Sequence, residues 1–301
     1  MTDSSWDSFR YRVRAAKLVT PVIRELWLEP VGEPMRFRAG QYMLLADAKY
    51  AIPQRSYSVA SAPRADGLLS VLVTLVPNGP TSTWAHRLAM YDEVSVEGPF
   101  GTFVAAPDWA APVLLLGAGS GLAPLRSLAE ALLGVGGGGA GGVGDARPGG
   151  GVGRPGDGVG DARPGGGEPN PAMPPPVTLF FSGRTAADAI DRAQFEAWAA
   201  EFAQFDYRLT CTREAYEARH SRIPDLLAAE FTSLRGYAVF TSGPPGFVTG
   251  CQAAAEALGA DPVNIRTEEF FTEPSPWSSE MPPIPTASID TDAKSASPKE
   301  F

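Results

Sequence analysis

The hydrophobic pattern of this chain changes near Pro112, and that change limits the folds that the chain can adopt. Before it, across residues 9–104, short runs alternate apolar and polar side chains, and Gly, Pro, Asn and Asp separate the runs. After it, continuous apolar runs such as 113–116 alternate with segments of helical spacing such as 122–133. The first pattern is typical of a small antiparallel β-barrel, and the second of a doubly wound parallel sheet covered by helices. The sequence therefore predicts two domains, an antiparallel β-barrel followed by an α/β domain.

The same patterns predict the individual elements. About six barrel strands are expected, at residues 11–14, 22–28, 41–45, 54–60, 68–76 and 94–96, with one helix at 83–90. Four strands of the parallel sheet are expected at 113–116, 177–181, 206–212 and 237–241, and four helices at 122–133, 188–202, 223–230 and 245–258.

Composition divides the chain further. We expect the barrel domain to occupy residues 1–108 and the α/β domain 109–271. Residues 134–176 are rich in Gly and Pro, and residues 272–301 are rich in Pro and Ser. Neither segment can bury a core, so we expect a disordered insertion and a disordered tail. The insertion leaves the sheet at the edge opposite the carboxyl ends of the strands, where such sheets bind ligands, so it should tolerate deletion.

Charge and rare residues exclude several function classes. The 301-residue chain has a net charge of −9, which argues against nucleic-acid binding. Its two cysteines and two histidines have no metal-ligand spacing, so we expect no iron–sulfur cluster and no structural zinc. No apolar run approaches the roughly 20 residues that cross a bilayer. With no signal peptide visible at the start, a reducing cytoplasm is the expected location.

The segment Gly117-Ala118-Gly119-Ser120-Gly121 lies between a predicted buried strand and a predicted helix. Small residues there let the backbone approach a pyrophosphate, whose charge the helix N-terminus favours. Pro124 suits the first helical turn. The spacing differs from G-x-G-x-x-G, so a phosphate site and a tight structural turn are both consistent with this segment.

A second segment, Arg55-Ser56-Tyr57-Ser58, places a guanidinium, an aromatic ring and a hydroxyl close together. Arginine can bind a phosphate with two hydrogen bonds, tyrosine can cover a flat ring, and serine can hydrogen-bond a ring nitrogen. A polar edge strand is the alternative interpretation of the same residues.

Taken in order, these segments resemble the ferredoxin–NADP reductase superfamily, in its oxygenase-reductase-like branch. The resemblance runs from Phe9 to Phe271 apart from the insertion, and it implies a flavin cofactor, FAD or FMN, with NAD(P)H as co-substrate; we expect FAD. It implies that Arg55 binds the flavin phosphates, that Tyr57 lies against the flavin, and that Ser58 lies near flavin N5. The remaining cofactor-binding residues that we expect from it are Val73, Gly79, Ser82, Thr83, Gly117, Gly119, Ser120, Gly121, Pro124, Ser182, Arg184, Gly243, Pro244 and Pro245.

The nicotinamide end of the resemblance contains one departure. The family motif C-G-P-P corresponds to Ser242-Gly243-Pro244-Pro245, so a serine replaces the family's cysteine. That cysteine is not a covalent catalyst, and hydride transfer stays compatible with Ser242. The family often ends in E-x-[FY], which matches Glu268 and Phe270, or Glu269 and Phe271 one residue later. We expect Ser58, Ser242, Glu268 and Phe270 at the reaction centre, with core packing as the alternative for the aromatics.

The sequence leaves the choice between NADH and NADPH open. Arg184 and Arg213 follow two predicted strands, where an arginine accommodates a 2′-phosphate. Arg184 could instead stack on adenine or pair with Asp188. Cys211 and Cys251 are interpreted as small buried apolar residues.

The resemblance implies transfer of hydride from NAD(P)H to FAD, and then of electrons to an acceptor. We expect a separate redox protein as acceptor, such as a ferredoxin, a P450 or an oxygenase component, because no fused iron–sulfur or haem domain is visible. A diaphorase-like reductase of free flavin or quinone, and a regulatory module without turnover, are the alternatives.

Overall fold

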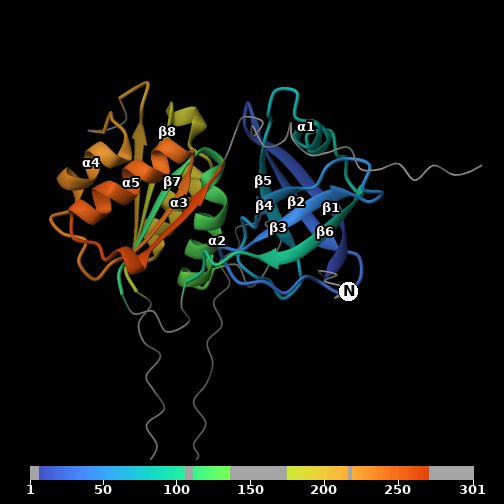
Figure 1. Ribbon diagram of the computed structural model, residues 1–301, viewed down its shortest axis with the longest axis horizontal. Coiled ribbons are helices and arrows are strands. Elements are labelled where there is room, and N and C mark those ends of the chain that lie inside the picture. The colour runs from blue at the N-terminus through green and yellow to red at the C-terminus, as the bar shows by residue number, and fades with distance from the viewer. Residues whose placement is uncertain (1–6, 106–110, 136–174, 216–218, 271–301) are drawn as a thin grey trace, which may run out of the picture.

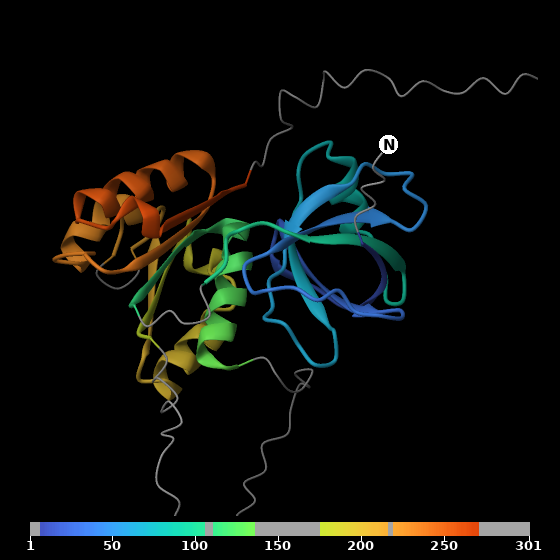
Figure 2. The ribbon, with the colours of Figure 1, turned by 60° about the horizontal axis from the view of Figure 1, so that its bottom comes forward.

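The structure is a computed structural model that describes residues 7–105, 111–135, 175–215 and 219–270. Within these residues, the chain forms two sheets that lie beside one another (Figures 1 and 2). The expected boundary at residue 108, most of the 134–176 insertion and the whole 272–301 tail lie outside the described residues. The domain limits therefore stay predictions, whereas the two-sheet architecture is confirmed.

The first sheet is antiparallel and carries, among the described residues, six strands in the order β4-β3-β6-β1-β2-β5. They are β1 (Ser8–Thr20), β2 (Ile23–Pro30), β3 (Tyr42–Asp47), β4 (Arg55–Ser58), β5 (Leu69–Thr74) and β6 (Glu93–Phe100). A bridge between Val59 and Val71 links the end of β4 to β5, the strand at the opposite end of this order. The sheet therefore curls into a barrel, and its interior is filled by apolar side chains from every strand.

Two barrel predictions needed correction. β1 is much longer than the predicted 11–14, because register shifts at Val13/Ala15 and Leu18/Thr20 interrupt the alternation that identifies a strand. The helix predicted at 83–90 is α1 (Pro80–Ala85), which begins earlier because Pro80 occupies its first turn. It ends at Ala85, where the Arg24 side chain donates hydrogen bonds to the carbonyls of Ala85 (3.3 Å) and, past the helix, Leu88 (2.8 Å).

The second sheet is parallel, in the order β11-β10-β7-β8-β9 among the described residues. Its strands are β7 (Val113–Ala118), β8 (Val177–Gly183), β9 (Phe205–Cys211), β10 (Ala238–Gly243) and β11 (Ile265–Glu269). Its helices are α2 (Leu122–Leu133), α3 (Arg192–Glu201), α4 (Ile223–Glu230) and α5 (Pro245–Ala257). The strand order reverses between β7 and β10, which makes their carboxyl ends the expected ligand edge.

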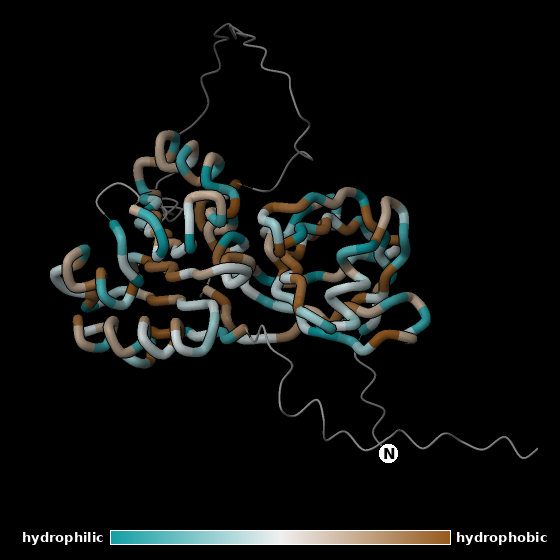
Figure 3. The backbone as a smooth tube through the Cα atoms, turned by 90° about the horizontal axis from the view of Figure 1, so that it is seen from above, coloured by the Kyte–Doolittle hydropathy of each residue, from teal (hydrophilic) through white to brown (hydrophobic). Residues whose placement is uncertain are grey.

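Helices cover both faces of this sheet (Figure 1). Leu115 packs on one face with α2 and α3, whereas its neighbours Leu114 and Leu116 pack on the other with α4 and α5. Burial on both faces explains why β7 is apolar without alternation. Hydrophobic stretches of the backbone run through the interior of the α/β half (Figure 3).

The sequence missed β11, the fifth strand, because only Ile265 of its five residues is buried. A polar edge strand has no periodic signal, and only pairing with β10 identifies it. The helix predicted from Asp188 begins at Arg192, since Asp188 ends a 3-10 turn and Asp191 adopts a left-handed conformation with φ of 54°.

Candidate active site

The carboxyl ends of three neighbouring strands bring together three segments that are far apart in the sequence. Ser242 at the end of β10 pairs with Gly117 of β7 on one side and with Glu268 of β11 on the other. This row lies at the point where the strand order reverses, which is where parallel sheets bind nucleotides.

The glycine segment after β7 packs directly against the segment after β10. A side chain at Gly121 would meet the carbonyl carbon of Ser242 at 2.6 Å, so this approach requires glycine. Gly119 adopts a left-handed conformation with φ of 57°, and a side-chain carbon there would meet nothing within 4 Å. The 3-10 turn Gly119–Gly121 therefore presents open backbone just before α2 begins.

The barrel reaches this edge through Ser58, the last residue of β4. The Ser58 hydroxyl donates a hydrogen bond to Glu268 Oε1, and Ser58 itself is buried. Burial raises the pKa of Glu268 to about 7, and the hydrogen bond from Ser58 offsets part of that rise. A hydroxyl and a carboxyl that titrates near neutrality thus meet where the two sheets adjoin.

Ser242 is fully buried beside this pair. Its Oγ has no hydrogen-bond partner within the described part of the chain. A buried hydroxyl without a partner costs free energy, and such groups are concentrated where a ligand completes the bonding.

A second polar contact joins the two sheets at the glycine segment. Thr74 Oγ1 at the end of β5 donates a hydrogen bond of 2.9 Å to Ser120 Oγ. This contact fixes the position of the open turn relative to the barrel.

The other barrel residues that we predicted to bind flavin lie on β4, β5 and α1. Arg55 is exposed, and its Nη1 donates to the Gln54 carbonyl at 2.9 Å, so most of its donors face solvent. Tyr57 is half-buried, and burial raises its pKa to about 12, which keeps the phenol protonated. β4 is the outermost strand in the sheet order and has two exposed residues, as the edge-strand interpretation expects, and a flavin role for this segment stays a prediction.

Three further residues that we predicted to bind flavin make hydrogen bonds or packing contacts within the barrel domain. The Ser82 hydroxyl accepts a hydrogen bond from the Val76 amide at 3.1 Å and donates to the Gly79 carbonyl at 3.2 Å. Val73 lies in the barrel core, and its carbonyl is 2.8 Å from His86 Nε2. Thr83 is half-buried in α1, where its amide donates to the Gly79 carbonyl. A flavin role for these residues stays a prediction.

The predicted nucleotide residues lie on both sides of the row. Pro124 is buried in the first turn of α2, and Pro244 and Pro245 begin α5 directly after Gly243. The Phe270 amide donates to the Gly243 carbonyl at 2.8 Å, and its ring is half-buried. The alternative match to the family's E-x-[FY] ending uses Glu269 and Phe271. Glu269 is exposed, and Phe271 lies outside the described residues.

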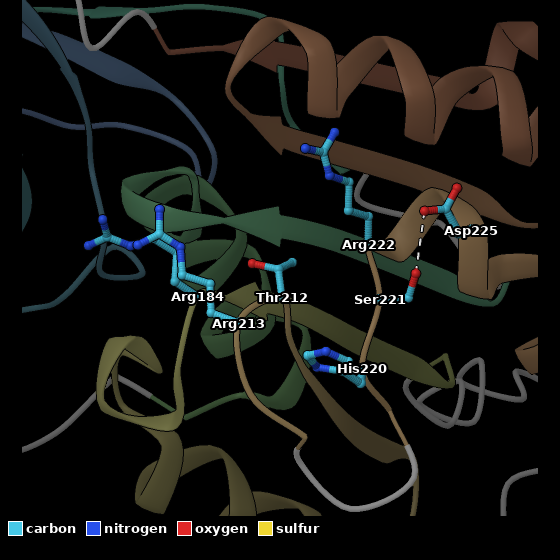
Figure 4. Close-up of a pocket in the computed structure, with 7 residues that line it drawn as sticks. All are labelled: Arg184, Thr212, Arg213, His220, Ser221, Arg222 and Asp225. Atoms are coloured by element: carbon cyan, nitrogen blue, oxygen red, sulfur yellow. Dashed lines mark hydrogen bonds between the residues drawn. The ribbon is translucent and has the colours of Figure 1, made fainter.

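A cavity of about 510 Å³ opens further along the same edge, beyond β8 and β9. Three arginines line it, namely Arg184, Arg213 and Arg222, and Arg184 and Arg213 extend in the same direction (Figure 4). Arg184 Nη2 lies 3.4 Å from Asp188 Oδ1, so the predicted ion pair forms. Ser182, on the strand that leads to Arg184, is half-buried.

Known proteins resemble this chain in both sequence and fold. Residues 22–104 match the family model described as an oxidoreductase FAD-binding domain. The chain is 25% identical to reductase component 1 of terephthalate 1,2-dioxygenase from Comamonas sp., over 89% of this chain and 69% of that protein. It is 26% identical to the crystal structure of the Amycolatopsis cytochrome P450 reductase GcoB, with a TM-score of 0.69, over 88% of this chain and 70% of that one.

The family model, the Comamonas relative and the Amycolatopsis structure together support membership of this chain in the ferredoxin–NADP reductase superfamily. A superfamily structure from Neisseria gonorrhoeae, a ferredoxin NADP+ reductase with bound FAD and NADP, has the same fold at 20% identity. Its TM-score is 0.65, and the match covers 89% of this chain and 100% of that one. The match to an FAD-binding domain and the similarity to named reductases indicate that the chain described here is an FAD-binding oxidoreductase.

The residues present fit the FAD and NAD(P)H of this superfamily. The open backbone at Gly119 suits a pyrophosphate, and the exposed Arg55 offers donors to a flavin phosphate. The unpaired Oγ of Ser242 suits a polar group of the nicotinamide. The described residues contain no group of three or more His, Cys, Asp or Glu that could hold a metal ion. No helix among them has the length and apolar character that crossing a membrane requires.

The sequence analysis did not identify several residues that the fold brings to this site or close to it. Thr74 gave no signal, because a threonine at a strand end is ordinary. His220 and Arg222 line the arginine cavity from the segment before α4, beyond any motif. Arg126 could have been found, since it is a charged residue within an apolar helical stretch, and it proves to be buried.

Proposed function

We propose that this chain takes hydride from NADPH onto FAD and passes the electrons to a separate redox protein. The observation that carries the proposal is the hydrogen bond from Ser58 of the barrel to Glu268 of the parallel sheet. It joins the predicted flavin residues to the edge where Gly117 and Ser242 lie. A flavin held by the barrel and a nucleotide held by the sheet would meet there.

When bound, FAD supplies a ring that accepts hydride from a nicotinamide and releases electrons singly or in pairs. The chain's own residues bind and orient both groups. We assign Arg55 to the flavin phosphates and Tyr57 to the face of the ring. The turn Gly119–Gly121 receives the nucleotide pyrophosphate on its backbone amides.

We assign Ser58 and Glu268 to proton handling at the reaction centre. Ser58 Oγ donates to Glu268 Oε1, and a pKa of about 7 lets this carboxyl gain or lose a proton at physiological pH. Ser242 lies next to Glu268 in the sheet and offers its unpaired hydroxyl to the nicotinamide. The half-buried ring of Phe270 would exclude water from this place.

The arginine cavity supports NADPH over NADH. A 2′-phosphate adds a dianionic group at the ribose, and Arg184, Arg213 and Arg222 surround a space of about 510 Å³. Arginine is suited to phosphate because its donors match the phosphate oxygens in pairs. Among the described residues that line the cavity, Asp225 is the one carboxylate, and it lies 3.4 Å from the Ser221 hydroxyl.

The acceptor that we propose is a protein. The Comamonas relative is named as a reductase component of a dioxygenase, and the Amycolatopsis structure as a cytochrome P450 reductase. A net charge of −9 favours a basic partner through electrostatic steering, which high salt weakens. We place the reaction in the cytoplasm, where the buried free thiols of Cys211 and Cys251 would stay reduced.

The test is anaerobic reduction of the purified, FAD-loaded protein. We expect the flavin absorbance to bleach with NADPH and to bleach more slowly with low concentrations of NADH. A protein that binds no FAD, or whose flavin neither nucleotide bleaches, would contradict the proposal. Arg213→Gln should raise the KM for NADPH about tenfold or more and leave the KM for NADH unchanged, so NADH is the internal control. Equal KM changes for both nucleotides would exclude Arg213 as a 2′-phosphate ligand.

A further inference from the structure

Three residues of α2 hold three successive residues of the barrel. Arg126 Nε donates to the Ala60 carbonyl at 2.7 Å, and Ser127 Oγ donates to the Ser61 carbonyl at 2.7 Å. Glu130 Oε2 accepts from the Ala62 amide at 2.7 Å. We call these three α2 residues the interdomain clamp. They bond backbone groups, so they fix the path of the chain at residues 60–62.

Arg126 is the centre of the clamp. Its Nη2 donates to Glu25 Oε1 on β2 at 2.6 Å and to Ser70 Oγ on β5 at 2.7 Å. Its Nη1 donates to Asp191, just before α3. The side chain is 3% exposed and that of Glu25 is 1% exposed, so the ion pair is shielded from water. Lys17 of β1 lies 3.1 Å from the other Glu25 oxygen.

The clamp lies between the two halves of the reaction centre. Ala60 comes two residues after Ser58, which contacts Glu268. Arg126 comes five residues after Gly121, which ends the open turn. α2 also lies alongside β5. Ser120, in the turn before α2, contacts Thr74 at the end of β5, and Arg126 of α2 contacts Ser70 near the start of the same strand. One rigid helix therefore connects the nucleotide turn to the segment that carries Ser58.

If its only effect were on stability, burying these charges would bring little net gain. Removing charged groups from water is costly, and well-packed apolar residues of similar volume often serve stability equally well. What a planar guanidinium adds is direction, because its donors fix several acceptors at set angles. A directional contact is useful where two bodies must keep one orientation.

Resting on the function proposed above, we propose that Arg126 is a positioning residue that sets the alignment of the nicotinamide against the flavin. Hydride transfer needs the reacting atoms about 3–3.5 Å apart, and a displacement of about 1 Å can slow such a step roughly 100-fold. The barrel carries the flavin and the parallel sheet carries the nucleotide. Any change in their relative orientation therefore changes that distance.

The test separates the two half-reactions of the FAD-loaded protein. Arg126→Met keeps an unbranched, though shorter, side chain and removes the charge and the hydrogen-bond donors. We expect anaerobic bleaching of the flavin by saturating NADPH to slow at least about tenfold. Oxidation of the dithionite-reduced flavin by ferricyanide needs no nicotinamide alignment, so its rate should stay within twofold, as should FAD content. Arg208→Met is the matched control, because Arg208 pairs with Asp206 and Glu230 inside the α/β half.

Several results would overturn the proposal. Bleaching by NADPH within twofold of the natural protein would show that alignment does not depend on Arg126. An equal fall of both half-reactions would show that Arg126 only maintains the fold. If Arg126→Met does not fold, Ser127→Ala provides the same comparison, with an expected loss of roughly threefold in bleaching alone. If the natural protein itself is not bleached by NADPH, the proposed function fails, which is a different outcome from a normal Arg126 variant.

Discussion

Replacing Glu268 with glutamine should change how the stability of the protein depends on pH. Burial raises the pKa of Glu268 from 4.5 to about 7 in the folded chain, with the Ser58 hydrogen bond opposing part of the rise. A carboxyl with a raised pKa stabilises the fold fully only below its unfolded pKa, and that contribution is lost as the pH rises through 7. The rise corresponds to about 3 kcal/mol. Glutamine stays neutral, so the variant does not lose this contribution.

We therefore expect Glu268→Gln to gain stability relative to the natural protein as the pH increases. The difference in unfolding free energy between the two proteins should change by about 3 kcal/mol in favour of the variant between pH 4.5 and pH 8. Urea unfolding at closely spaced pH values, with FAD in excess, measures this difference. Comparing the two proteins at each pH cancels other titrating groups, which they share.

Glu269→Gln is the matched control for this measurement. Glu269 is the next residue of β11 and is exposed, so its difference from the natural protein should stay nearly constant across the same range. A constant difference for Glu268→Gln as well would refute the argument, because it would show that the Glu268 carboxyl is solvated like its neighbour.

Three further substitutions test individual parts of the site. Ser242→Cys should raise the unfolding free energy by about 1 kcal/mol in urea, because an unpaired buried thiol costs less than an unpaired hydroxyl; a loss of stability would contradict the unpaired state of Ser242 Oγ. Gly121→Ala should weaken NADP+ binding at least about tenfold in calorimetry, since the added carbon would lie 2.6 Å from the Ser242 carbonyl carbon. Gly246→Ala, where nothing lies within 4 Å, should bind normally, and equal effects would exclude the steric reason. Arg55→Ala should lower FAD occupancy, measured by visible absorbance, without changing the fold; full occupancy would remove Arg55 from the flavin phosphates.

Much of the fold could be predicted because its signals are local. The apolar run of β7 and the helical spacing of α2 and α4 depend on burial of neighbouring residues, and α2 and α4 have the predicted bounds. β11 could not be predicted in this way, because an edge strand with one buried residue has no periodic pattern. Its existence depends on hydrogen bonds to β10, which come from a distant part of the chain.

The same distinction between local and long-range signals decides which parts of the site could be predicted. The chemistry of the Arg55–Ser58 segment and of the glycine segment 117–121 made each a candidate cofactor site, and the family resemblance assigned the flavin to the first and the nucleotide to the second. They could not indicate that Ser58 contacts Glu268, or that the Ser242 hydroxyl finds no hydrogen-bond partner among the described residues. Those facts depend on which strands adjoin, since strand order places residues from separate segments in one row.

The sequence by itself determined that this chain has a barrel and a doubly wound sheet, and which short segments could bind a flavin and a nucleotide. Hydrophobic periodicity and small-residue loops encode these properties within a few residues. Only the tertiary structure decided how the two halves face each other, through Arg126, Glu25 and the Ser58–Glu268 contact. Burial then raised the pKa of Glu268 to about 7 and left the Ser242 hydroxyl without a hydrogen-bond partner in the described part of the chain. Desolvation and pairing are properties of the surroundings in space, which no single segment of the sequence contains.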